Sequence, residues 1–161
     1  MQYNKRKHLK LLKSSQKSEK PRKILSDEEF LKLLESRPDE NFFELEAYSA
    51  MMIAHLHWQN REQYFELIEQ FLNGPINFLD LRKKYRSISD AVERLKAELI
   101  LLDPVEPYNK AFGFTELINE IIMLFDRYCP DPRIREDYEF SEEELKNLIQ
   151  KIFIGMKNRY P

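Results

Sequence analysis

Apolar residues recur every three or four positions along most of the chain after residue 24, as they do on one face of an α-helix. No segment alternates apolar and polar residues in the way that a half-exposed strand does. Helices of this kind bury their apolar faces by packing against one another. The sequence therefore predicts an all-α fold, namely an antiparallel helical bundle of four main helices with one or two short helices.

Local signals mark where several of these helices begin and end. The segments Ser26–Glu29 and Ser141–Glu144 each have the capping-box pattern, in which a serine and a glutamate satisfy backbone N–H groups at a helix start. Asn73-Gly74-Pro75 predicts a firm helix end, because glycine suits the left-handed residue after a helix and proline cannot continue one.

The middle of the chain leaves one choice open. The pattern that begins near Phe42 continues to Leu72, either as one long helix or as two helices with a break around Asn60. A short helix is then expected over Asn77–Tyr85, and a separate helix is expected to start near Ser89.

Charge is distributed unevenly along the 161 residues. Residues 1–23 hold nine Lys or Arg and one acid, whereas residues 24–161 hold 17 Lys or Arg and 27 acids. Like charges repel and few apolar groups in residues 1–23 could be buried, so we expect a mobile basic tail before a single acidic helical domain over 24–161. The tail is either a solubilising extension or a nucleic-acid contact. Its candidate phosphate-binding residues are Lys5, Arg6, Lys7, Lys10 and Lys13.

The residues that most enzymes and cofactor sites need are missing or badly spaced. Three glycines, none close to another, cannot build a phosphate-binding loop. His55 and His57 are two residues apart and point roughly 200° apart on a helix, so they cannot share a metal ion. Cys129 is the single cysteine and has no enzyme motif around it. We therefore expect that the protein is not an enzyme and that it has no catalytic residue, metal, cofactor or small-molecule ligand.

The hydrophobic runs are all much shorter than the roughly 20 residues that span a bilayer, so no membrane insertion is expected. A cytoplasmic location is expected, with the interior of an organelle such as a plastid as the alternative.

Acidic residues gather before and at the start of the last predicted helix. These acids can interact favourably with the helix dipole and increase solubility, or they can form a docking surface for a basic partner. The candidate partner-binding residues are Glu136, Asp137, Glu139, Glu142 and Glu143.

One motif resembles a known family. The stretch from Phe71 to Ile76 reads Phe-Leu-x-Gly-x-Ile, and an apolar or aromatic residue follows the glycine by seven and then by eleven positions. This pattern, together with Tyr128-Cys129-Pro130-Asp131-Pro132 before the last helix, resembles the bacterial colicin-D-type immunity proteins over roughly residues 60–160. The motif residues are Phe71, Leu72, Gly74, Ile76, Leu81 and Tyr85.

The resemblance implies a small helical protein without catalysis or cofactor, which binds a basic toxin nuclease domain through acidic residues and blocks its substrate site. The leading interpretation is therefore a non-catalytic, immunity-type binding domain. The alternatives are a nucleic-acid- or ribosome-associated protein tethered by its basic N-terminal tail, and a scaffold or assembly protein.

Overall fold

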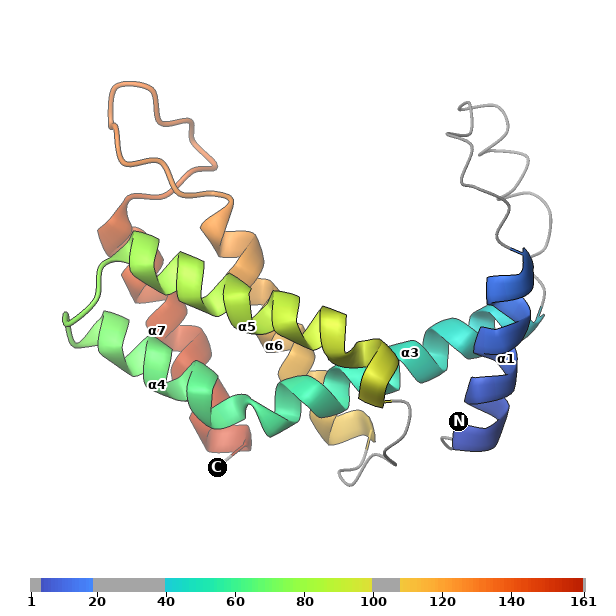
Figure 1. Cartoon of the computed structure of the whole chain (residues 1–161). Helices are drawn as coiled ribbons and strands as arrows, with labels where there is room; N and C mark the ends of the chain where they lie inside the picture. The colour runs from blue at the N-terminus through green and yellow to red at the C-terminus, as the bar shows by residue number, and fades with distance from the viewer. Residues whose placement is uncertain (1–3, 19–39, 100–107, 161) are drawn as a thin grey trace.

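The computed structural model describes residues 4–18, 40–99 and 108–160, and the protein is an all-α helical bundle (Figure 1). The prediction of the fold class is confirmed. Within the described ranges the only β-type pairing is an isolated bridge between Tyr128 and Phe140. The helices are α1 (Lys5–Ser18), α3 (Glu40–Gln59), α4 (Arg61–Leu72), α5 (Phe78–Leu99), α6 (Tyr108–Phe125) and α7 (Glu142–Arg159).

Helix α3 connects two parts of the molecule. Figure 1 shows α4, α5, α6 and α7 packed together, with the C-terminal half of α3 against α5 and α6, while α1 crosses the N-terminal half of α3 at the other end. Two separate hydrophobic clusters correspond to these parts. The larger one includes Ala54 and Trp58 of α3, and the smaller one joins Leu11 of α1 to Tyr48 and Met51 of α3.

Aromatic side chains from different helices fill the larger cluster. Phe78 and Tyr85 of α5 both pack edge-on against Phe125 of α6, with ring centroids 5.6 and 5.3 Å apart. Tyr64 of α4 lies against Tyr85, with centroids 4.7 Å apart. Such pairs contribute about 0.5–1.5 kcal/mol each beyond the burial of their surface. They tie α4, α5 and α6 into one core.

The basic N-terminal segment differs from the expected mobile tail, because residues 5–18 form α1 and dock on α3. His8 and Leu11 are 0% and 7% exposed. The ring of His8 lies 5.4 Å from that of Tyr48, and Lys7 forms an ion pair with Glu44. The prediction from charge repulsion was wrong. Residues 8 and 11 are spaced so that they share one face of α1, and this face packs on α3.

Helix α5 corrects a second expectation. A short helix over Asn77–Tyr85 followed by a new one near Ser89 was predicted, but α5 is continuous for 22 residues. Tyr85 and Val92 are buried and Ile88 is partly buried, so the inward-facing positions keep a helical period across the polar residues between them.

Other boundaries follow the sequence signals. A break does separate α3 from α4 at Asn60, whose side-chain amide donates to the carbonyl oxygen of Leu56 at 2.8 Å. Gly74 ends α4 with a φ of +97°, and its N–H donates to the carbonyl of Gln70 at 3.1 Å. The capping box at Ser26–Glu29 lies outside the described residues.

Candidate partner-binding loop

The connection between α6 and α7, residues 126–141, is closed at its base by backbone hydrogen bonds; we call it the α6–α7 loop. The N–H of Phe140 donates to the carbonyl of Arg127 at 2.7 Å, and the N–H of Cys129 donates to the carbonyl of Phe140 at 3.0 Å. The guanidinium of Arg127 lies 4.4 Å from the centre of the Phe140 ring. Tyr128 packs on Phe78 of α5 with ring centroids 4.2 Å apart, which anchors the loop to the bundle.

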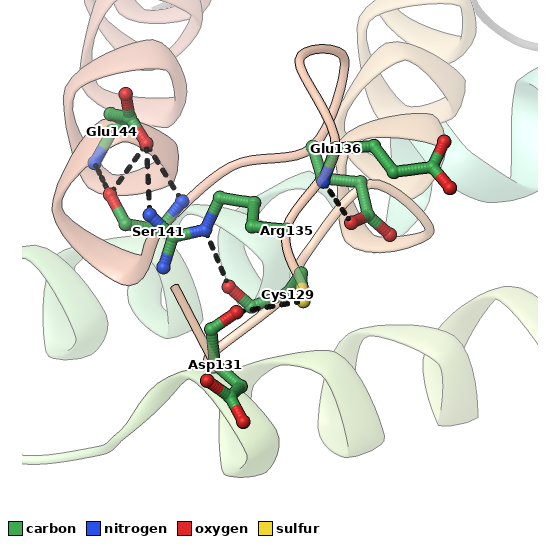
Figure 2. A network of polar contacts seen from close by, with 7 residues as sticks. Cys129, Asp131, Arg135, Glu136, Ser141 and Glu144 are labelled. Atoms are coloured by element: carbon green, nitrogen blue, oxygen red, sulfur yellow. Dashed lines mark hydrogen bonds and ion pairs between the residues drawn. The ribbon is translucent and has the colours of Figure 1, made fainter. Parts of the chain in front are cut away.

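Side chains also fix the interior of the loop (Figure 2). Nε of Arg135 donates to the carbonyl of Cys129 at 2.9 Å, and its Nη1 lies 4.0 Å from Oε2 of Glu144. The thiol of Cys129 is directed to the carbonyl oxygen of Asp131 at 3.6 Å. Arg133 donates from Nε and Nη2 to the two carboxylate oxygens of Asp131, and this contact lowers the pKa of Asp131.

The capping box predicted at Ser141 is present at the start of α7. The N–H of Glu144 donates to Oγ of Ser141 at 3.2 Å, while the Ser141 N–H and hydroxyl donate to Oε2 of Glu144 at 2.8 and 2.6 Å. These bonds to the carboxylate lower the pKa of Glu144. The loop therefore enters α7 in a fixed direction.

The α6–α7 loop nevertheless leaves two large apolar side chains in solvent. Ile134 is 71% exposed and Tyr138 is 56% exposed, although the backbone on both sides of them is hydrogen-bonded. The carboxylate of Glu136 lies next to the Tyr138 hydroxyl and raises the pKa of Tyr138.

The structure brings the five predicted partner-binding acids to this same end of the molecule. Glu136, Asp137, Glu142 and Glu143 are exposed. Glu139 is only partly exposed, and its carboxylate accepts the N–H of Glu136 at 2.9 Å, so it holds the loop together. Sequence reasoning missed Ile134 and Tyr138. The available signal was two apolar residues in a charged segment that follows two prolines and has no helical periodicity.

The residues of the family-like motif lie elsewhere and serve the core. Phe71, Leu81 and Tyr85 are buried, and the rings of Phe71 and Phe78 lie 6.3 Å apart. Leu72 and Ile76 pack at the edge of the same cluster. The motif therefore shapes the turn between α4 and α5 and contributes nothing to the exposed loop.

The histidines and the cysteine occupy structural positions. Nδ1 of His57 lies 2.8 Å from the Tyr64 hydroxyl, and Nε2 of His55 lies 3.0 Å from the side-chain amide of Gln59. Cys129 is a buried free thiol. Across residues 4–18, 40–99 and 108–160, no group of three or more His, Cys, Asp or Glu is arranged to hold a metal ion. None of the helices in these ranges combines the length and apolar character that a membrane span requires.

Comparisons of the chain with models of protein families, with curated proteins and with solved structures gave no match. The resemblance to immunity proteins therefore stays a prediction.

Proposed function

We propose that this protein is a non-catalytic binding domain that docks on a basic protein partner through the α6–α7 loop and the start of α7. The observation that carries the proposal is the exposure of Ile134 and Tyr138 on an internally bonded loop, with Glu136 and Asp137 between them in the sequence.

The order of the loop favours tight association. Binding loses free energy when a flexible segment must be immobilised, and a loop already fixed by its own hydrogen bonds avoids much of that loss. Arg127 and Arg135 both donate to loop backbone carbonyls, at 2.7 and 2.9 Å, so the apolar pair is presented in one geometry.

The chemistry of the surface indicates the partner. Interfaces combine a few buried apolar or aromatic anchors with a polar rim, and tyrosine is enriched among the anchors. Ile134 and Tyr138 would enter an apolar pocket, and the exposed acids would face basic residues around it. The resemblance to immunity proteins names one partner class of this kind, a toxin nuclease domain, whose basic substrate site the acids would cover.

The test starts from the full-length chain as bait in a lysate of its source, with captured proteins identified by mass spectrometry. The affinity of each captured basic protein is then measured for the wild type, for Ile134→Ser/Tyr138→Ser and for Glu136→Lys/Asp137→Lys. The proposal expects both double variants to lose affinity at least tenfold. The loss from the charge reversal should shrink at high salt, because screening already weakens long-range attraction there.

Control variants carry changes of the same kind at other exposed positions. Ile154→Ser alters an exposed apolar residue of α7, and Glu116→Lys/Glu120→Lys reverses two exposed acids of α6. Both should bind like the wild type. Equal binding by the loop variants and the wild type would show that the partner surface is not this loop. A captured nuclease adds a second readout, since the wild type should inhibit its hydrolysis of nucleic acid and the loop variants should not.

A further inference from the structure

Helix α1 is held in one orientation on the surface of α3. Its inner side carries His8 and Leu11, which are buried against the residues around Tyr48 and Met51. The ion pair between Lys7 and Glu44 fixes one flank of the helix and neutralises this acid of α3. Helix α1 therefore keeps one orientation relative to α3.

The outer side of α1 is basic. Arg6 and Lys10 are exposed. Because successive helical residues are rotated by about 100°, positions 6, 10, 13 and 17 fall within roughly 60° of one another, opposite to positions 8 and 11. All four of these positions are Arg or Lys in the sequence. We call this row the α1 basic stripe: Arg6, Lys10, Lys13 and Lys17.

The dimensions of the stripe match a regular row of phosphates. At about 1.5 Å of rise per residue, the stripe is roughly 16 Å long. One strand of a duplex carries a phosphate about every 3.4 Å along the axis, so the stripe runs past roughly five phosphates.

We infer that the α1 basic stripe binds the phosphate backbone of double-helical nucleic acid without reading sequence. The four residues of the stripe are Arg or Lys, so the stripe offers charge but no aromatic stacking platform, which disfavours single strands. A membrane surface fits less well, because amphipathic helices enter lipid with their apolar side and this side of α1 is occupied by α3. This surface lies at the other end of the molecule from the α6–α7 loop, so the inference is independent of the proposed function (Figure 1).

The inference is tested with the full-length chain and a fluorescent 20-base-pair DNA duplex, by anisotropy titrations between 50 and 200 mM salt. Four neutralised phosphates give a slope of log affinity against log salt of about −3.6, which is a loss of roughly 150-fold over this range. Arg6→Gln/Lys10→Gln should reduce the size of the slope by about 1.8 and weaken binding at low salt. An RNA duplex of equal length, a single strand and anionic lipid vesicles are the comparison ligands.

The control is Lys83→Gln/Lys84→Gln, which removes two exposed cations of α5 and should leave the slope unchanged. Unchanged thermal midpoints would show that both variants fold. The inference is overturned if the duplexes do not bind, if both double variants lose binding equally, or if vesicles or single strands bind more tightly than the duplexes. Loss of duplex binding in the α1 variant with capture of protein partners intact would support the inference and leave the proposed function standing.

Discussion

His57 and Tyr64 form a hydrogen bond inside the core, with Nδ1 of the imidazole 2.8 Å from the phenol oxygen. The two residues come from α3 and α4, on either side of the break at Asn60. Both side chains are buried, and burial lowers the pKa of His57 to about 4. Burial therefore favours the neutral imidazole in the folded protein, and the bond joins the two helices.

The first prediction concerns acid stability. The unfolded chain binds a proton at this imidazole below about pH 6.5, whereas the folded protein does so only near pH 4, so stability falls as pH decreases through this window. Each unit of pKa difference corresponds to about 1.4 kcal/mol, which gives a loss on the order of 3 kcal/mol. Urea unfolding at pH 7, 5.5 and 4.5 should show this fall in the wild type. The His57→Asn variant should have a lower free energy of unfolding at pH 7 and should lose less of it on acidification. If the free energies of both proteins fall equally with pH, the effect does not come from His57.

The second prediction compares one chemical change at two tyrosines. Tyr64→Phe removes the hydroxyl bonded to His57 and should lower the free energy of unfolding by about 1–2 kcal/mol. The Tyr85 hydroxyl is buried and has no hydrogen-bond partner among the described residues. Because an unsatisfied buried hydroxyl opposes folding, Tyr85→Phe should leave stability unchanged or raise it. Chemical denaturation of both variants at pH 7 checks the contrast, and a large loss in Tyr85→Phe would point to an unrecognised partner.

The third prediction uses two glycines in helix interiors. A Cβ on Gly113 would lie 2.5 Å from the hydroxyl oxygen of Tyr160, whereas a Cβ on Gly155 would meet no atom within 4 Å. Gly155→Ala should therefore stabilise the protein by about 0.5–1 kcal/mol, the usual gain in a helix. Gly113→Ala should not show this stabilisation. The Tyr160 side chain cannot move away freely from the new Cβ, because it is packed edge-on against Trp58 with ring centroids 5.8 Å apart.

Removing the obstructing oxygen is the control for this third prediction. Gly113→Ala combined with Tyr160→Phe should recover most of the stabilisation seen for Gly155→Ala, as measured by thermal midpoints. If the double variant is no more stable than Gly113→Ala, the close approach of the hydroxyl is not the cause.

The fourth prediction concerns the start of α7. Ser141→Ala removes the acceptor of the Glu144 N–H and should destabilise the protein by about 1 kcal/mol, while Ser141→Thr keeps the hydroxyl and should be close to neutral. The bonds from Ser141 also hold the pKa of Glu144 below its usual value, so their contribution is present above about pH 4.5 and is lost as the pH falls. The Ser141→Ala variant loses the hydroxyl bond to this carboxylate but keeps the backbone N–H bond, so the difference in stability between it and the wild type should narrow in acid. A difference independent of pH would contradict the bond from the Ser141 hydroxyl to the Glu144 carboxylate.

The helix content and the start of α7 could be predicted because their causes are local. Ser141 and Glu144 are three residues apart, and their mutual hydrogen bonds need nothing from the rest of the chain. The continuity of α5 and the docking of α1 depend on contacts with other helices. Tyr85 packs on Tyr64 and Phe125, and Leu11 clusters with residues of α3. The polar residues near Tyr85 and Leu11 suggested a helix break and a mobile tail, because these contacts with other helices cannot be read from the local sequence.

Only part of the candidate site could be predicted from the sequence. Clustered acids such as Glu136 and Asp137 can be counted without a structure. The exposure of Ile134 and Tyr138 could not be foreseen, because it depends on how the loop closes through Arg127 and Phe140 and on the docking of Tyr128 against α5.

The position of α3 in two hydrophobic clusters of different size has a consequence for its amide protons. Amides near Ala54 and Trp58 are covered by the larger cluster and should exchange with deuterium only when the whole bundle opens. Amides near Tyr48 and Met51 are covered only by the smaller cluster with α1 and should exchange sooner, because this part of α3 can unwind locally once α1 separates. A single unbroken helix would then show two rates of deuterium uptake, with the change falling between Met51 and Ala54.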